Sequence, residues 1–160
     1  MEFQNIKDNP TIISFICKLY FQEWKDFYQD NYQIYSYYQL VKKYREWYLT
    51  KNSNDKLFLF WNEDKLIGSI GIGENDIIDY QKPKSDSMYI TDIYVLPSYR
   101  GMGYANRILK FGIDIIKKLN KVVYISVSKF DLIPWYNKNG FRKIDSHILN
   151  QEEYIIMELK

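Results

Sequence analysis

Residues 88–105 read MYITDIYVLPSYRGMGYA and carry the most specific pattern of the chain. A strand pattern covers residues 88–96, a helical pattern begins near residue 103, and between them lies the run Arg100-Gly101-Met102-Gly103-Tyr104-Ala105. A glycine turn before a helix leaves backbone N–H groups free for an anion, and arginine adds a planar fork of donors for phosphate oxygens. The alternative is an ordinary tight turn with a solvated arginine. The chain has one alanine and four arginines against eighteen lysines, so this run departs from its composition.

Length and composition bound the class of protein. The 160 residues predict one domain that spans residues 1–160. No run of about 18 apolar residues could cross a bilayer, and the first residues lack the basic and apolar parts of a signal peptide. The single cysteine, Cys17, excludes an intrachain disulfide and a cysteine-based zinc cluster. We therefore expect a cytoplasmic protein with no metal and no membrane partner. A net charge of +2 is too small to indicate a nucleic-acid partner.

The first half of the chain predicts helices and a hairpin. We expect a short strand at 2–6, helices at 10–29 and 33–49, a turn at 52–55, and paired strands at 56–61 and 65–72. Asp8-Asn9-Pro10 supplies the start of the first helix. Gly68, Gly71 and Gly73 lie inside a strand pattern with no helix behind them, which favours bulges or a close backbone approach over a nucleotide loop.

The second half predicts alternating strands and helices. A polar loop at 74–87 leads to the strand at 88–96, which is followed by elements at 103–119 (helix), 121–127 (strand), 141–145 (strand) and 153–159 (strand). A short helix precedes residue 140, with Asp131 as its N-cap, Pro134 in its first turn and Gly140 as its stop.

Two motifs in this order resemble the GNAT N-acetyltransferase superfamily. The first is the Arg-x-x-Gly-x-Ala run at 100–105 after a strand, and the second is Tyr-x-x-x-Gly-Phe at 136–141. The strong match covers residues 88–145, whereas the first half agrees only in the order of its elements. The resemblance implies an α/β (α+β) fold, with a central mixed, mostly antiparallel sheet of six to seven strands flanked by about four helices.

The same resemblance implies acetyl-CoA as cosubstrate. The strands at 88–96 and 121–127 would splay apart to admit it, its pantetheine would pair with backbone of the first strand, and its pyrophosphate would lie on the glycine run. The implied binding residues are Ile93, Tyr94, Val95, Arg100, Gly101, Met102, Gly103, Tyr104, Ala105 and Lys129. Many members of the superfamily carry Asn at the position of Lys129, so a lysine there either reaches a phosphate or faces solvent.

The family reaction is direct transfer of an acetyl group from the thioester to a primary amine, in a ternary complex. Tyr136 occupies the general-acid position, and a packed aromatic is the alternative for it. Asp92 is either a structural carboxylate that grips backbone or a site residue that binds the amine. In related polyamine acetyltransferases the base position corresponds to Thr91, which cannot act as a base, so the proton acceptor stays open.

Other polar residues have simpler explanations. His147 is expected on the surface, in a loop before the last strand, and Cys17 is expected as a buried, inert thiol. Glu23, Asp26 and Asp30 either attract a cationic amine or form a solvated helix face.

The leading functional hypothesis is a small-molecule amine N-acetyltransferase, which in this family is often a homodimer. The alternatives are transfer to a protein, peptide or aminoacyl-tRNA amine, and a non-catalytic acyl-CoA sensor that would not depend on Tyr136. A dinucleotide-binding oxidoreductase is disfavoured, because the chain lacks a full Gly-x-Gly-x-x-Gly motif and its acidic partner.

Overall fold

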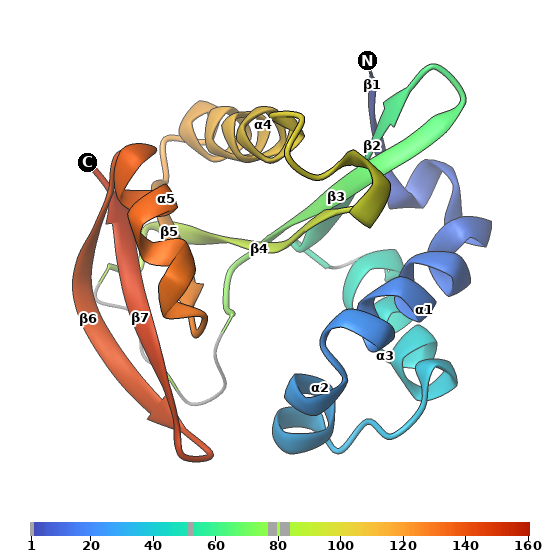
Figure 1. Cartoon of the computed structure of the whole chain (residues 1–160), viewed down its shortest axis with the longest axis horizontal. Helices are drawn as coiled ribbons and strands as arrows, with labels where there is room; N and C mark the ends of the chain where they lie inside the picture. Colours follow the sequence, from blue (N-terminus) through green and yellow to red (C-terminus); the bar gives the residue numbers. More distant parts are fainter. Residues whose placement is uncertain (1, 51–52, 77–79, 81–83) are drawn as a thin grey trace.

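The computed structural model describes residues 2–50, 53–76, 80 and 84–160. Within them, seven strands form one open sheet in the order β1-β2-β3-β4-β5-β7-β6 (Figure 1). The strands are β1 Glu2–Asn5, β2 Lys56–Asn62, β3 Lys65–Gly73, β4 Ser87–Val95, β5 Val122–Val127, β6 Phe141–Leu149 and β7 Glu152–Leu159. Neighbouring strands are antiparallel except β4 and β5, which are parallel. The predicted mixed, mostly antiparallel sheet is confirmed.

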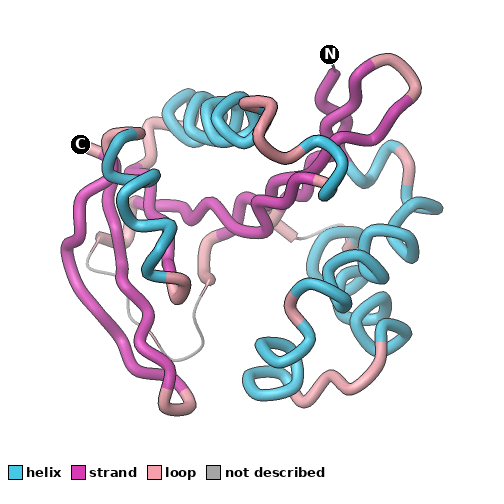
Figure 2. Tube along the Cα trace, in the orientation of Figure 1, coloured by secondary structure: helices cyan, strands magenta, loops and turns pink. Residues whose placement is uncertain are grey.

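Helices cover both faces of this sheet (Figures 1 and 2). In the described part of the chain they are α1 Ile13–Glu23, α2 Lys25–Tyr32, α3 Tyr37–Leu49, α4 Tyr104–Lys118 and α5 Ile133–Lys138. The first three share one buried cluster with side chains of β2, β3 and β4, and the last two share a second cluster on the opposite face. The helices α1, α3 and α4 bury stripes at spacings of three and four residues, as amphipathic helices on a sheet do, whereas α2 and α5 each bury one tyrosine. The arrangement matches the prediction, with five α-helices where about four were expected.

The helix predicted over residues 10–29 is two helices. Residues 6–8 and 10–12 form 3-10 turns, so α1 begins only at Ile13. At Trp24 the backbone leaves the helix, with φ −125° and ψ 32°. The Trp24 ring packs with its centroid 4.9 Å from that of Tyr20 and 5.8 Å from that of Tyr94. Periodicity alone cannot reveal this break, because it comes from tertiary packing of one large side chain.

The second helix starts later than predicted, at Tyr37 instead of residue 33. Gln33 has φ 55° and ψ 37°, the left-handed conformation that ends α2. Ser36 then caps α3, because its Oγ accepts the N–H of Gln39 at 3.3 Å while the Gln39 side chain accepts the N–H of Ser36 at 3.0 Å. This reciprocal capping box satisfies two N–H groups at the helix start and sets the boundary.

Two predictions near the C-terminus also differ from the structure. Asp131 lies inside a 3-10 turn at 130–132 and does not cap α5 through its side chain. The strand β6 continues to Leu149, so His147 pairs with Tyr154 of β7 instead of lying in a loop. Backbone pairing with β7 extends β6 beyond the residues whose apolar pattern predicts a strand.

Several turn predictions are confirmed. The strands β2 and β3 form the expected hairpin through Glu63 and Asp64, and Gly140 follows α5 with φ 93°. Parts of the predicted turn at 52–55 and of the predicted loop at 74–87 lie outside the described residues.

A bulge at Asp92 reverses the two faces of β4. The register against β3 shifts by one residue between Thr91 and Tyr94, and Asp92 has φ 49°. Before the bulge, Ile90 packs in the cluster under α4, whereas after it Tyr94 packs in the cluster under α1 and α3. Strict alternation along the strand would put Ile90, Asp92 and Tyr94 on one face, but they do not share one, because an inserted residue interrupts the two-residue period.

Two tyrosines of α3 hold the carboxylate of Asp92. The Tyr44 hydroxyl donates to Oδ1 at 2.7 Å, and the Tyr48 hydroxyl donates to Oδ2 at 2.6 Å. Tyr28 of α2 lies 2.9 Å from the Tyr44 hydroxyl and must donate to it, since the Tyr44 proton is already used. Burial raises the pKa of Asp92, and the bonds from Tyr48 and Tyr44 oppose that rise. The bulge is thus fastened to the helical layer by hydrogen bonds to a charged group.

The strands β4 and β5 separate after a short paired stretch. Residues 87–89 of β4 pair with residues 122–124 of β5, and the described residues show no pairing beyond these. The two strands therefore diverge toward their C-terminal ends, as Figure 1 shows for the middle of the sheet. This confirms the predicted splaying.

Glycines in β3 allow β4 to approach closely. A Cβ at Gly68 would lie 2.1 Å from the backbone oxygen of Tyr94, and one at Gly71 would lie 2.2 Å from Oγ1 of Thr91. Neither distance is compatible with a side chain, so the predicted close backbone approach is confirmed.

We predict that Gly68→Ala lowers the free energy of unfolding by at least about 2 kcal/mol, because a backbone carbonyl cannot yield without disturbing the sheet. Gly112→Ala in α4 is the matched control. Its Cβ would meet the flexible end of Ile70 at 2.5 Å, and alanine gains about 1 kcal/mol of helix propensity over glycine. Urea denaturation of both variants measures the difference. Equal losses would contradict the role of the carbonyl.

We also predict that Tyr48→Phe destabilises the protein by about 2 kcal/mol at pH 8, because a buried carboxylate loses a charged hydrogen bond. The pKa of Asp92 is already raised in the folded state, and the variant raises it further. The loss should therefore shrink as the pH falls and Asp92 becomes protonated in the folded state of both proteins.

The exposed Tyr35, with 62% of its surface accessible, provides Tyr35→Phe as the control. Urea titrations at pH 8 and pH 4.5 separate the two effects. A loss of equal size at both pH values would show that the hydroxyl does not stabilise the charge.

Candidate active site

The run between β4 and α4 forms an open turn at a helix N-terminus. Gly101 and Gly103 have φ 79° and 80°, a conformation that side chains other than glycine rarely adopt. A Cβ on either glycine would meet no described atom within 4 Å, so space above the turn is open. Gly103 is the N-cap of α4 and provides no side-chain acceptor for the first N–H groups. Free N–H groups at the positive end of a helix dipole suit an anion such as phosphate.

The side chain of Arg100 already has partners. Its Nε donates to the Val95 carbonyl at 3.0 Å, and its Nη2 donates to Oε2 of Glu23 at 2.9 Å. The guanidinium also lies 5.6 Å from the ring centroid of Tyr94. These contacts connect the end of β4 to the end of α1. A phosphate would therefore compete with Glu23 for this arginine, so the predicted phosphate contact stays a prediction, and the backbone N–H groups are the better anion site.

The predicted backbone site for a cosubstrate lies on the free edge of β4. Tyr94 and Val95 pair with β3 on one side, and no described strand pairs with Ile93, Tyr94 or Val95 on the side of β5. Lys129 is exposed, and its carbonyl accepts the N–H of Leu132 at 3.0 Å. The structure thus brings the free edge of β4 next to the glycine turn along the chain, while Lys129 lies across the opening at the end of β5.

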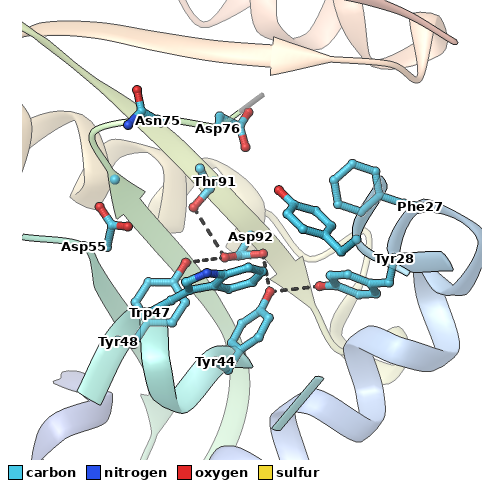
Figure 3. A pocket seen from close by; sticks show the side chains of 12 residues that line it. Phe27, Tyr28, Tyr44, Trp47, Tyr48, Asp55, Asn75, Asp76, Thr91 and Asp92 are labelled. Carbon is cyan, nitrogen blue, oxygen red and sulfur yellow. Dashed lines mark hydrogen bonds between the residues drawn. The ribbon is translucent and has the colours of Figure 1, made fainter. Parts of the chain in front are cut away.

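A cavity of about 240 Å³ lies between the helical layer and the sheet (Figure 3). Its aromatic lining comes from α2 and α3: Phe27, Tyr28, Tyr32, Tyr44, Trp47 and Tyr48. Its other lining residues come from the middle of β4, from the end of β3 and from the segments beside β2 and β3: Asp55, Gly73, Asn75, Asp76, Thr91 and Asp92. The described lining therefore combines three carboxylates with aromatic rings and contains neither lysine nor arginine.

Asp76 links the lining of this cavity to β5. It also lines a smaller adjoining cavity, and the hydroxyl of Ser126, on β5, donates to its Oδ2. Burial raises the pKa of Asp76 to about 7, the bond from Ser126 opposes the rise, and the charge of Asp92 adds to it. The charge of Asp76 also raises the pKa of tyrosines of four elements: Tyr32, Tyr89, Tyr136 and Tyr154. A carboxylate with this pKa can accept a proton near neutral pH.

Tyr136 lies in the first turns of α5 and is buried. Its ring packs against Trp135 and Phe141, with centroid distances of 4.7 Å and 5.9 Å. Burial raises the pKa of Tyr136 well above its usual value, and the charge of Asp76 adds to the rise. The hydroxyl therefore stays protonated at neutral pH, as a proton donor requires.

The structure brings together only some of the residues predicted for catalysis. Asp92 lines the main cavity, whereas Tyr136 lines neither cavity. Tyr136 is related to the site by the charge of Asp76, which raises its pKa. Cys17 is buried, and burial raises the pKa of its thiol to about 12, which agrees with the inert thiol expected. His147 contacts Tyr80, with ring centroids 5.4 Å apart, and lines neither cavity.

Sequence reasoning missed Asp55, Asp76 and the tyrosine pair of α3 as site residues. Asp55 and Asp76 lie in polar connections with no motif, so no sequence signal distinguished them from solvated loop residues. The spacing of Tyr44 and Tyr48 was a usable signal, because residues four apart lie on one face of a helix and both can reach one acceptor.

The described residues contain no group of three or more histidine, cysteine or acidic side chains close enough to hold a metal ion. None of their helices combines the length and the apolar character that crossing a bilayer requires.

Solved structures similar to this chain are acetyltransferases. The spermidine N-acetyltransferase SpeG chimera from Vibrio cholerae and hSSAT has a TM-score of 0.71 and 18% identity over 99% of this chain and 96% of its own. An aminoglycoside 6'-N-acetyltransferase complexed with coenzyme A has a TM-score of 0.70 and 16% identity over the same shares, 99% and 96%. A GNAT family acetyltransferase from Elizabethkingia anophelis with acetyl-CoA bound has a TM-score of 0.56 and 18% identity, over 76% of this chain and 82% of its own.

Identities this low establish a shared fold and nothing finer. No curated protein matches the chain. The profile of the Acetyltransferase (GNAT) family, however, matches residues 17–141, which is well over half of the sequence. Together with the splayed central strands and the glycine turn at the start of α4, this match assigns the chain to a family: it belongs to the GNAT acetyltransferases.

Proposed function

We propose that this protein is an acetyl-CoA-dependent N-acetyltransferase that moves the acetyl group directly to a primary amine of a small molecule. Residues 1–160 act as one catalytic domain. The observation that carries this proposal is the position of β4 between two sites. Asp92, in the bulge of β4, lines the acidic, aromatic cavity, and the C-terminal end of β4 leads into the glycine turn before α4. An acyl donor and an amine can thus meet at one strand.

The residues present fit acetyl-CoA as the donor. The glycine turn offers N–H groups and open space for the pyrophosphate, and the unpaired edge at 93–95 offers backbone groups to an amide-containing arm, as an added strand would. Two similar solved structures contain coenzyme A or acetyl-CoA, according to their descriptions. The cosubstrate supplies the activated thioester, so the protein has to position the amine and move protons.

Asp76 is the group that we assign to remove a proton from the amine. An ammonium has no lone pair, so it must be deprotonated before it attacks the thioester carbonyl. Asp76 lines the cavity, is held by Ser126 from β5 and has a pKa of about 7. Asp92 is the poorer acceptor, since each of its oxygens already receives a tyrosine proton. Its role is to bind and to hold the bulge.

Tyr136 is the group that we assign to protonate the departing thiolate. The raised pKa keeps its hydroxyl protonated at neutral pH. Asp76 takes the first proton, and attack of the neutral amine then forms the new C–N bond. The C–S bond breaks, the sulfur takes the Tyr136 proton, and the second proton lost by the nitrogen restores the Tyr136 hydroxyl. Proton transfer by a positioned side chain contributes about 100-fold or more to a rate.

A small acceptor fits the cavity better than a macromolecule does. The volume of about 240 Å³ suits a small organic amine. Its carboxylates would repel the phosphates of an aminoacyl-tRNA, and the net charge of +2 offers little attraction to compensate. The similar structures described as spermidine and aminoglycoside acetyltransferases also act on small amines.

We predict that Tyr136→Phe lowers kcat about 100-fold while the Kd for acetyl-CoA stays within about 2-fold, because the hydroxyl donates a proton but does not hold the donor. The assay is release of free CoA thiol across pools of polyamines, arylalkylamines, aminoglycosides, amino acids and short peptides. Tyr35→Phe controls for a general effect of losing a tyrosine hydroxyl. Unchanged turnover in Tyr136→Phe would remove it from the mechanism, and silence of the wild type in every pool would contradict the proposed function.

We predict that kcat/KM of the wild type falls about 10-fold per pH unit below about pH 7, because protonated Asp76 cannot accept the amine proton. Asp76→Asn should be about 100-fold less active and should lose this limb. The exposed Asp64 supplies the control variant Asp64→Asn, which should keep the profile. If Asp76→Asn retained the acidic limb, another group would be the proton acceptor.

A further inference from the structure

The cavity carries more negative charge than one amine needs. Asp92 enters it from β4, whereas Asp55 and Asp76 enter it from the segments before β2 and after β3, and Figure 3 shows all three around the cavity. The described residues do not bring three such groups close enough to share a metal ion, so the carboxylates are spread along the cavity wall. A spread of negative charge suits an elongated organic cation better than a compact ion.

These carboxylates repel one another when the cavity holds no cation. The charge of Asp55 raises the pKa of Asp92, and the charge of Asp92 raises the pKa of Asp76. Asp55 itself is constrained, because its Oδ1 accepts the N–H of Glu74 at 3.1 Å. A positive group among them would remove the repulsion, and the described lining contains no basic side chain to do so.

Asp92 is prepared to bind such a group. Its Oδ1 accepts the Tyr44 hydroxyl, whereas its Oδ2 accepts the hydroxyls of Tyr48 and Thr91, so Oδ1 keeps a lone pair for one further bond. The hydrogen bonds fix the orientation of the carboxylate before a ligand arrives, which reduces the entropy lost on binding.

The aromatic wall suits the rest of a cationic chain. Phe27 and Tyr32 of α2 and Trp47 of α3 line the cavity beside the carboxylates. Faces of aromatic rings attract an ammonium by about 0.5–2 kcal/mol, and they also bury methylene groups at about 0.8 kcal/mol each. Rings and carboxylates together recognise an alkyl chain with a charge at its end.

We propose that the acceptor is an aliphatic diamine or polyamine, whose reacting amine lies at Asp76 and whose second, unreacting ammonium lies between Asp92 and Asp55. This inference rests on the proposed function, because it names the acceptor of that reaction. Asp76 is bonded to Ser126 of β5, on the side assigned to transfer, whereas Asp92 is bonded to tyrosines of α3 and Asp55 directly precedes β2. A monoamine would satisfy only one of these two ends.

The test compares putrescine with butylamine and aminobutanol, which have the same chain length but no second charge. We expect kcat/KM for putrescine to exceed both by at least about 30-fold. Asp92→Asn and Asp55→Asn should reduce the difference to about 3-fold or less, whereas Asp64→Asn should preserve it. Asp55→Asn serves alone if Asp92→Asn does not fold. Equal use of the three amines by the wild type would overturn the inference and leave the acetyltransferase function intact.

Binding supplies a readout that does not depend on transfer. In calorimetric titrations of the wild type, putrescine should bind at least about 10-fold more tightly than butylamine, and Asp55→Asn should remove this preference. If no amine is acetylated, a preference that Asp55→Asn removes would still support the cation site while the proposed function fails. Equal affinities for putrescine and butylamine would overturn the inference.

Discussion

The hydrogen-bonded carboxylate of Asp92 is the constraint on which the site depends. It occupies the bulge of β4, with φ 49°, and two tyrosine hydroxyls of α3 fasten it to the helical layer. A buried carboxylate is costly without such partners. At the bulge, Asp92 points toward the cavity. The bulge also places all later side chains of β4 on the face opposite to the one that strict alternation would give. Without the bulge, Ile93 and Val95 would not face α4.

The same strand links the two halves of the proposed chemistry. On one side of the sheet, the end of β4 leads to the glycine turn, where the dipole of α4 favours an anion. On the other side, the bulge helps to line a cavity whose carboxylates favour a cation. In the described residues, β4 pairs with β5 only over residues 87–89, so the later edge of β4, which lies between these sites, is not paired with β5. The proposed donor, which is negatively charged, and the proposed acceptor, which is positively charged, would therefore be attracted to opposite faces of the sheet.

Electrostatics also separates the roles of the acidic groups. Asp92 accepts hydrogen bonds on both oxygens, which suits it for binding, whereas Asp76 has one serine partner and a pKa of about 7, which suits it for proton transfer. Tyr136 lies in an environment that keeps its hydroxyl protonated. Groups whose surroundings drive their pKa values apart can act as an acid and a base at the same pH.

The motifs at 100–105 and 136–141 indicated the family by resemblance, and the resemblance implied the sheet. Local patterns were enough to predict the hairpin of β2 and β3 and the glycine turn, because turn glycines and alternation act over a few residues. Only the tertiary structure decided the break at Trp24, the bulge at Asp92 and the meeting of Asp55, Asp76 and Asp92 in one cavity. These features depend on contacts between segments far apart in the chain. A buried ring or a tyrosine hydroxyl forty residues or more away can outweigh the preference of the local backbone, and no short-range pattern records it.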